Sequence, residues 1–392
     1  MANPLAAHYE RFRVAERLLL TGHSHQAWPD VALEGQIEAF DDAARLIDDK
    51  WERAFAKAEE VREGFRRLLA DPGAEIALGA STHDLVLRLL SALDLRGRPR
   101  LVTTDGEFHT LRRQLARLAE EGIELVRVPA EPADTLAERL AAAVDERTAA
   151  VLVSAVLFET ARIVPGLDAV AVACARTGTE LVVDAYHALG AMPFGLAERG
   201  LSDAWVLGGG YKYLQLGEGN CFLRVPAHGC EMRPAITGWY AEFGALTDEH
   251  DANRVAYGRG AERFAGSTYD PTSHYRAARV MRFFAEQGLT PDRLRQSYRR
   301  QVELLAARVD ALGAPDDVVT RDRQTPLDRY GAFLALRSPV AGELRAALAQ
   351  RGVLADSRGP WLRLGPAPYV SDEQLDAAVG LLGEAIRSLP RA

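Results

Sequence analysis

Residues 180–187 read Glu-Leu-Val-Val-Asp-Ala-Tyr-His, a short apolar run that ends in an acid. A continuous run of aliphatic residues predicts a strand buried on both faces, as in the parallel sheets of α/β proteins. Ligands of such sheets bind beyond the carboxyl ends of the strands. Asp184 is therefore expected at a functional site.

Similar apolar runs alternate with amphipathic stretches on both sides of this segment. The apolar runs lie at 101–103, 125–128, 150–153, 204–207 and 221–225, and helical patterns lie at 111–120, 136–144 and 167–176. This alternation predicts an α/β domain whose mainly parallel sheet is flanked by helices.

The remaining segments suggest how the domains divide. A helical pattern occupies 31–70, the residues 239–272 show little periodicity, and helical and apolar segments resume from about residue 274. We expect three parts, which are an N-terminal segment with the start of the helical lead-in (1–50), a large α/β domain with a crossing segment (51–272), and a small C-terminal α+β domain (273–392).

Composition narrows the class of protein. The chain has 392 residues, of which 48% are hydrophobic and 26% charged, with a net charge of -8, so neither nucleic acid nor a membrane surface is an expected partner. No apolar run approaches the ~18 residues of a membrane helix. Three cysteines without paired spacing, scattered histidines and the absence of a secretory pattern at the N-terminus predict a cytoplasmic protein that lacks a metal centre.

Lysine is scarce in this chain. Of its 47 lysine and arginine residues, only Lys50, Lys57 and Lys212 are lysines. An amine can lose its proton and condense with a carbonyl group, whereas a guanidinium stays charged, so a retained lysine in an unusual setting indicates amine chemistry. Lys212 has such a setting, because it follows an apolar run and three glycines at 208–210.

Asp184 and Lys212 together favour a pyridoxal 5'-phosphate site. They are separated by one expected strand, so both are predicted at neighbouring strand ends. A lysine amine holds this cofactor, and a carboxylate opposite the pyridine nitrogen keeps that nitrogen protonated. The alternative is a strand-capping acid and an unrelated surface lysine.

Two segments of the chain carry a family resemblance. Residues 184–187 (Asp-Ala-Tyr-His), followed by 208–214 (Gly-Gly-Gly-Tyr-Lys-Tyr-Leu), resemble kynureninase, a class V aminotransferase-like enzyme of fold type I that depends on pyridoxal phosphate. The likeness runs from Gly22 to the region of Arg363. It implies the fold type I architecture and a homodimer with shared active sites.

The resemblance also implies site residues. Catalytic roles fall to Lys212, Asp184 and His187, cofactor contacts to Ser81, Thr82, Phe108, Tyr211, Trp239 and Thr268, and the substrate carboxylate to Arg363. In this scheme Phe108 stacks on the pyridoxal ring, Tyr211 bonds the phosphate, and Thr268 serves the neighbouring subunit. A bidentate guanidinium grip suits a carboxylate.

The residues themselves leave open the roles of two pairs, Ser81 with Thr82 and His23 with His25. Ser81 and Thr82 precede a helical pattern, and a helix N-terminus binds phosphate, but a plain N-cap explains the same residues. His23 and His25 are candidate substrate contacts, yet alternate residues of an extended segment point to opposite faces. The two histidines are therefore not expected to act together.

Departures from the kynureninase pattern affect the substrate. The acid expected soon after Phe108 is absent, the N-terminal motif reads Gly-His-Ser-His-Gln at 22–26, and Tyr269 and Asp270 stand where a proline pair is usual. These positions flank the aromatic pocket of the family. Altered pocket contacts change specificity, so we expect poor turnover of kynurenine itself relative to the enzyme's own substrate.

The leading hypothesis is hydrolysis of the Cβ–Cγ bond of kynurenine or a related amino acid, with alanine as a product. The second hypothesis keeps the cofactor but makes the enzyme an aminotransferase or lyase acting on another amino acid. A cysteine desulfurase is disfavoured, because no cysteine follows Cys230. The hypothesis from a different class is a degenerate cofactor-binding protein with little turnover.

Overall fold

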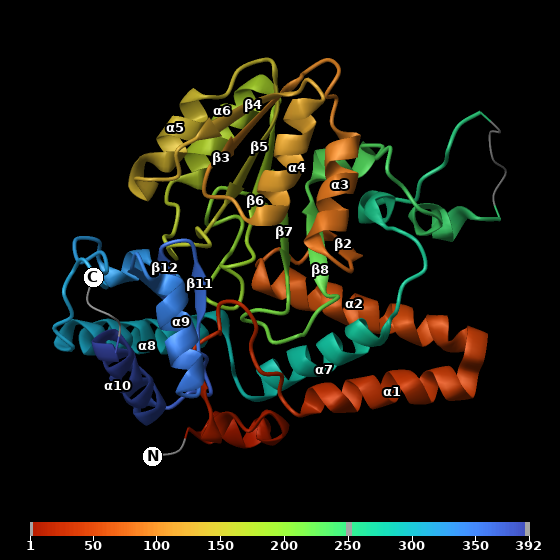
Figure 1. Ribbon diagram of the computed structural model, residues 1–392. Helices are drawn as coiled ribbons and strands as arrows, with labels where there is room; N and C mark the ends of the chain where they lie inside the picture. Colours follow the sequence, from red (N-terminus) through yellow and green to blue (C-terminus); the bar gives the residue numbers. More distant parts are fainter. Residues whose placement is uncertain (1–2, 248–252, 389–392) are drawn as a thin grey trace.

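A seven-stranded sheet forms the centre of the larger domain (Figure 1). The computed structural model describes residues 3–247 and 253–388. The strands are β2 (Glu75–Gly79), β3 (Arg100–Thr104), β4 (Glu124–Val128), β5 (Thr148–Ser154), β6 (Glu180–Asp184), β7 (Trp205–Gly209) and β8 (Cys221–Val225). Their order in space is β2-β8-β7-β6-β5-β3-β4, with β8 antiparallel to both neighbours and the other pairs parallel.

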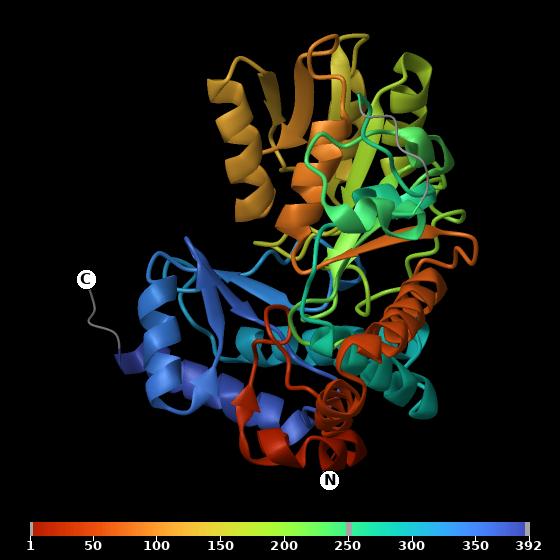
Figure 2. The ribbon, with the colours of Figure 1, turned by 90° about the vertical axis from the view of Figure 1, so that its right-hand side faces the viewer.

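Helices cover both faces of this sheet (Figures 1 and 2). The α-helices are α1 (Val31–Leu46), α2 (Lys50–Leu68), α3 (Thr82–Ala92), α4 (His109–Glu120), α5 (Leu136–Ala142), α6 (Leu167–Thr177), α7 (Thr272–Glu286), α8 (Pro291–Ala311), α9 (Ala341–Gln350) and α10 (Asp372–Ser388). One apolar cluster joins the sheet to α2, α5, α6 and α7, and another joins the opposite face to α3 and α4. The expected α/β fold is confirmed.

A smaller domain lies below the carboxyl ends of the large sheet. Its antiparallel sheet has the order β11-β12-β9, formed by β9 (Leu334–Arg337), β11 (Asp356–Arg358) and β12 (Trp361–Leu364). The chain's first residues pack into this domain, because β1 (Leu18–Leu19) pairs with β10 (Val353–Leu354) and Tyr9 is buried in its apolar cluster.

Two further segments complete the description. The aperiodic region 239–272 contains two short 3-10 helices, η7 (Trp239–Ala245) and η8 (Gly260–Phe264), and its first part projects to the right in Figure 1. Residues 248–252 of this region lie outside the described ranges. Within those ranges, no helix has the length and apolar character needed to cross a bilayer. The domain boundaries remain predictions.

The parallel strands bring their last residues to one edge of the sheet. Ser154 at the end of β5 is the register partner of Asp184 at the end of β6, and Asp184 in turn pairs with Leu207 of β7. All seven residues of β5 are buried. The polar side chains at this edge are therefore held in place by the buried strands that precede them.

A buried carboxyl group ties two of these strand ends together. Glu107 is 1% exposed, and its oxygens accept hydrogen bonds from the hydroxyls of Thr104 (2.7 Å) and Ser154 (2.6 Å) and from the Ser154 N–H (3.2 Å). Burial raises the pKa of Glu107 to about 7, despite these hydrogen bonds, and the charge of Asp184 adds to the rise. The folded protein therefore favours the protonated form of Glu107.

This preference predicts a pH-dependent stability. Below the unfolded pKa of about 4.5 both states hold the proton, whereas between about pH 4.5 and 7 the unfolded state releases it first, so stability falls as pH rises. Relative to Glu107→Gln, the unfolding free energy of the parent protein should fall by roughly 2 kcal/mol between pH 5 and pH 8. Urea unfolding at both pH values measures this difference.

Glu138→Gln provides the matched control, because Glu138 is an exposed carboxylate on α5. That variant should track the parent protein across the same pH range. A constant stability difference between the parent and Glu107→Gln would refute a raised Glu107 pKa.

Candidate active site

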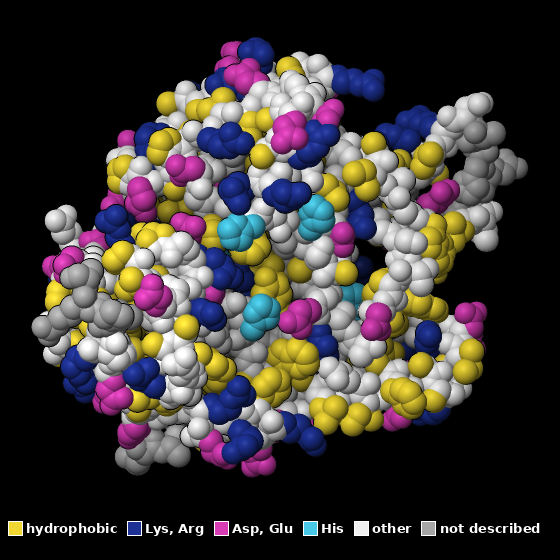
Figure 3. Space-filling view, in the orientation of Figure 1, with side chains coloured by type: hydrophobic (Ala, Val, Ile, Leu, Met, Phe, Trp, Pro, Cys, Tyr) yellow, Lys and Arg dark blue, Asp and Glu magenta, His cyan; other side chains and the backbone are white. Residues whose placement is uncertain are grey.

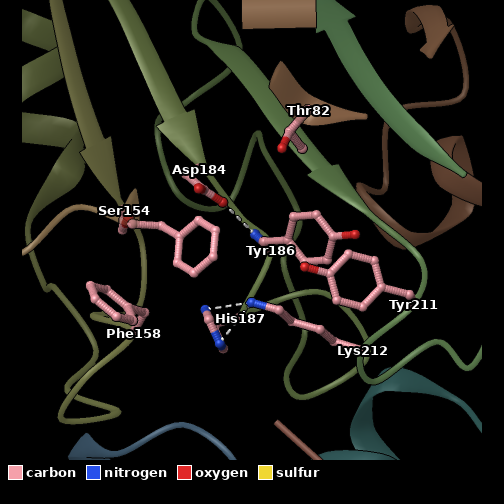
Figure 4. Close-up of a pocket in the computed structure, with 9 residues that line it drawn as sticks. Thr82, Ser154, Phe158, Asp184, Tyr186, His187, Tyr211 and Lys212 are labelled. Carbon is pink, nitrogen blue, oxygen red and sulfur yellow. Dashed lines mark hydrogen bonds between the residues drawn. The ribbon is translucent and has the colours of Figure 1, made fainter. Parts of the chain in front are cut away.

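A cavity lies at the carboxyl ends of β5, β6 and β7. Its lining residues are Thr82, Phe108, Ser154, Phe158, Asp184, Tyr186, His187, Tyr211 and Lys212 (Figure 4). A second cavity shares Thr82, Phe108 and Asp184 with it, so the two adjoin. The structure thus brings together six residues that the sequence analysis predicted for the site, which are Asp184, His187, Tyr211, Lys212, Phe108 and Thr82.

Glycines allow Lys212 to enter this cavity. A Cβ atom on Gly209 would lie 2.3 Å from the hydroxyl oxygen of Tyr186, and one on Gly210 would lie 2.4 Å from the side chain of Leu216. Contacts this close exclude a larger residue at either position. The glycine run before Lys212 is therefore explained by close packing around the turn.

The turn that carries Lys212 is fixed from behind. Gln215 adopts a left-handed conformation (φ 59°) and donates its N–H to the carbonyl of Lys212 (3.1 Å). The buried Gln215 side chain accepts a hydrogen bond from Tyr9 (2.5 Å) and donates one to Gln26 (2.8 Å). The N-terminal segment thereby helps to set the position of the lysine.

The Lys212 amine is buried beside His187. Its Nζ lies 3.0 Å from Nε2 and 3.4 Å from Nδ1 of the His187 ring, and the two groups point toward each other in Figure 4. Burial lowers the Lys212 pKa to about 7, against the opposing effect of the Asp184 charge. Burial and the nearby Lys212 also lower the pKa of His187. A neutral amine is therefore available near neutral pH.

Aromatic rings surround this amine. Nζ of Lys212 lies 4.7 Å from the ring centroid of Tyr186, 5.4 Å from that of Phe108 and 5.9 Å from that of Tyr211. Flat apolar walls of this kind suit a planar ligand, and they keep water away from the amine.

Asp184 meets the cavity from the end of β6. One of its oxygens accepts the N–H of Tyr186 (2.8 Å), and burial raises its pKa although this bond and the charge of Lys212 oppose the rise. Among the described residues, no cation lies within ion-pair distance of Asp184. The carboxyl group therefore has capacity for a positively charged partner inside the cavity.

The start of α3 forms another part of the wall. Ser81 is the N-cap, and its hydroxyl accepts the N–H of Asp84 at 3.2 Å. Thr82, the first residue of the helix, lines both cavities. The plain capping role of Ser81 is therefore present, and Thr82 is the residue that faces the ligand space.

Trp239 and Thr268 lie apart from the lining residues. Trp239 begins η7 and is 44% exposed, and its indole N–H donates to the hydroxyl of Thr268 at 3.2 Å. Neither residue lines either cavity of this chain. Their roles toward a cofactor remain predictions.

Arg363 borders the cavity through Phe158. It is 3% exposed, and Nη1 donates to the carbonyl of Phe158 at 2.5 Å. Of the two candidate histidines, His23 is fully buried near Asp356, whereas His25 is exposed and stacks on the Tyr211 ring at 4.9 Å. The two histidines differ in their surroundings, but the extended segment expected here is a turn, in which the N–H groups of Ser24 and His25 both donate to the carbonyl of Thr21.

The sequence reasoning did not single out several residues at the site. Ser154, Phe158, Glu107 and Asp356 were not identified. Ser154 could have been found as the residue that ends a predicted buried strand. Asp356 carried no comparable signal, because its importance depends on pairing across a hairpin.

Comparison with known proteins places this geometry in context. No protein-family model matches the chain. It is 23% identical to an uncharacterized aminotransferase, YcbU, of Bacillus subtilis, over 88% of each chain. It is 26% identical to acetylornithine aminotransferase of Streptomyces coelicolor, over 92% of this chain and 82% of the relative.

Solved structures match almost the whole chain. A C-DES mutant with glycine covalently linked to its PLP cofactor superposes with a TM-score of 0.83 at 16% identity, covering 97% of this chain and 99% of that one. The cysteine desulfurase of Thermococcus onnurineus gives 0.80 at 17% identity and 99% coverage of both. This chain therefore has the α/β fold of the fold type I PLP-dependent enzymes.

Proposed function

We propose that this protein is a pyridoxal 5'-phosphate enzyme that transaminates an α-amino acid or eliminates a group from its side chain. The observation that carries the proposal is the buried Lys212 amine, whose pKa is lowered to about 7 beside His187. Such an amine can condense with a carbonyl near neutral pH. The aminotransferase names of its relatives and the PLP cofactor of a structural neighbour support the same chemistry.

The lining residues fit this cofactor. Asp184 is a carboxyl group with capacity for a cation, and a protonated pyridine nitrogen is one. Phe108 offers a flat ring within 5.4 Å of the Lys212 amine. Thr82 and the N-terminus of the 11-residue α3 offer a hydroxyl and backbone N–H groups to a phosphate.

Each residue then has a definite task. Pyridoxal phosphate, when bound, supplies an electron sink for negative charge at the α-carbon of the amino acid. Lys212 would hold the cofactor and, once displaced by the substrate's amine, take the proton from that carbon. Its pKa near 7 lets Nζ both accept and return a proton. His187, kept neutral by burial, orients Nζ through their contact.

Arg363 would bind the substrate's carboxylate. Its guanidinium adjoins Phe158 of the cavity wall, and its charge contributes to the lowered pKa of Lys212, which supports its position beside the reacting groups. Basic side chains and histidines lie around the central hollow in Figure 3, together with acidic ones.

Hydrolysis of kynurenine has less support than transamination or elimination. The relatives are named aminotransferases, and the structural neighbours include a cystine C-S lyase and cysteine desulfurases. A degenerate binding protein is disfavoured by the buried, cavity-facing amine of Lys212, whose pKa of about 7 suits proton transfer, because a protein that only binds needs no such group.

Sulfur transfer to a protein cysteine also has little support. Cys174 and Cys221 are buried, Cys230 lies in η6 (Ala227–Glu231), and none of the three lines either cavity. Burial raises the pKa of Cys221 to about 11, which disfavours the thiolate form required of a nucleophile. Elimination that releases the sulfur-containing group needs no protein thiol.

A homodimer is part of the proposal. Ile37, Phe40 and Ile47 on or beside α1 are 52%, 74% and 70% exposed, and yellow side chains gather over α1 in Figure 3. The projecting segment adds exposed Trp239, Phe243 and Leu246. Clusters of exposed apolar side chains mark interaction surfaces, and a second copy of the chain is the occupant that the family resemblance implies.

The first prediction concerns the cofactor lysine. Borohydride reduction of the purified protein, followed by peptide mapping, should place a pyridoxyl group on Lys212, because its amine faces the cavity and its lowered pKa gives a neutral fraction near pH 7. Lys212→Ala should abolish the adduct and the visible absorption band. An adduct on Lys50 or Lys57, or none, would contradict the assignment, and Lys57→Ala serves as the matched control.

The second prediction concerns the reaction. Mass spectrometry of products should show either conversion of an amino acid to its oxo acid only when a 2-oxo acid acceptor is added, or release of pyruvate and ammonia from cysteine or cystine without an acceptor. Both outcomes begin with loss of the α-proton to Lys212. Alanine released from kynurenine, at a kcat/KM of roughly 10⁴ M⁻¹s⁻¹ or above, would instead favour hydrolysis.

The third prediction concerns assembly. Phe40→Glu places a charge in the exposed apolar cluster of α1 and should shift the protein from dimer to monomer in light scattering after size exclusion. Val172→Glu on α6 is the control, because Val172 is 62% exposed but lies outside that cluster. A parent protein that is monomeric at micromolar concentration would refute the homodimer.

A further inference from the structure

Three charged side chains of one hairpin stand beside the cavity. Asp356 of β11 is the register partner of Arg363 of β12, and Arg358 follows two residues later on the same strand face. One oxygen of Asp356 accepts a hydrogen bond from Nη2 of Arg363, and the other accepts one from Nη1 of Arg358 at 2.7 Å. A single carboxylate therefore bridges two guanidinium groups.

Arg363, the proposed binding residue for the substrate carboxylate, is thus already bound to the carboxylate of Asp356. Nη1 of Arg363 is used by the Phe158 carbonyl and Nη2 by Asp356, while the buried Nε has no partner in the described part of the chain. A substrate carboxylate brought to Arg363 would lie next to Asp356. Two carboxylates in contact repel each other, so one of them must yield.

Arg358 offers Asp356 a second partner. The side chains of Arg358, Asp356 and Arg363 are 39%, 13% and 4% exposed, so the three are graded from the solvent to the interior. Asp356 also accepts the N–H of Ser357 at 2.7 Å, through the same oxygen that meets Arg358. The bonds of that oxygen can persist while the other oxygen leaves Arg363.

His23 adds to the polar surroundings of Asp356, and against the effect of burial it holds, together with Arg363, the pKa of Asp356 well below its usual range. Nε2 of His23 lies 3.6 Å from Asp356, just outside hydrogen-bond distance, and neither ring nitrogen has a hydrogen-bond partner among the described residues. The ring packs on Phe333 at 4.5 Å, and burial lowers the His23 pKa to about 4. A neutral His23 leaves the two arginines as the cations that hold Asp356.

We propose that Asp356 is a resident carboxylate that occupies Arg363 in the free protein and is retained by Arg358 when a substrate carboxylate takes its place. This inference rests on the proposed function. An intramolecular anion reduces the apparent affinity for any carboxylate to the intrinsic affinity multiplied by the fraction of protein in which Arg363 is free. Simple carboxylates are therefore rejected, and α-amino acids bind because their amine gains a second attachment at the Lys212 end of the cavity.

The test measures binding of two small ligands to the cofactor-loaded protein. Glycine carries an amine and a carboxylate, whereas glycinamide lacks the carboxylate. Asp356→Asn should tighten glycine binding about tenfold in calorimetry, because Arg363 is freed, and should leave glycinamide within about twofold. Equal shifts for both ligands, or weaker glycine binding, would overturn the proposal.

Two further variants separate exchange from a general change in charge. Arg358→Gln should weaken glycine binding, because displaced Asp356 then lacks its second cation. Glu218→Gln makes the same charge change as Asp356→Asn near His25, on a side chain that is 61% exposed, and should change glycine binding less than twofold. A Glu218→Gln effect as large as that of Asp356→Asn would contradict the exchange.

The melting temperature of the cofactor-free protein provides a second measurement. It distinguishes failure of this inference from failure of the proposed function. Acetate should raise the Tm of cofactor-free Asp356→Asn and leave that of the parent unchanged, since Arg363 is open in the variant alone. If the parent binds no cofactor but this difference appears, the exchange stands and the proposed function fails. If the cofactor binds and acetate stabilises neither protein, the exchange is wrong.

Discussion

The burial of one amine and one carboxyl group in the same cavity governs the arrangement of this site. Lys212 is 6% exposed, and burial lowers its pKa to about 7, while burial raises the pKa of Asp184. Removing either charge from water is costly unless a partner compensates it. Both residues line one cavity, Asp184 from the end of β6 and Lys212 from the turn that follows β7, and no ion pair joins them.

The smaller domain brings a buried guanidinium to the cavity wall. Arg363 reaches the cavity wall from β12, and its position depends on how the two domains meet. Arg162 of the large domain joins the two, because its Nη1 donates to Thr325 at 2.7 Å and to Asp322 at 3.4 Å. Nearby, the N–H of Gly331 bonds the carbonyl of Ala161 at 2.7 Å. This junction fixes Phe333 and Arg363 relative to the lysine.

The cofactor and the reaction depend on different parts of the proposed site. The residues proposed to hold pyridoxal phosphate bear on which cofactor binds, and they do not select among the reactions that this cofactor supports. The side chains that face the substrate decide the outcome, because specificity comes from contacts made in the transition state. In this chain Phe158 lines the cavity, and we propose that Arg363 and Asp356, which adjoin it, take part in these contacts.

The sequence by itself determined the α/β fold, the strand-end position of Asp184 and the special setting of Lys212, because these depend on local patterns of apolar residues and glycines. Tertiary structure decided the rest. Glu107 and Ser154 meet through neighbouring strands, and Asp356 meets Arg363 through the register of a hairpin. Such pairings depend on packing between segments that are distant in sequence or joined by a turn, and a pattern along one segment carries no information about its partner.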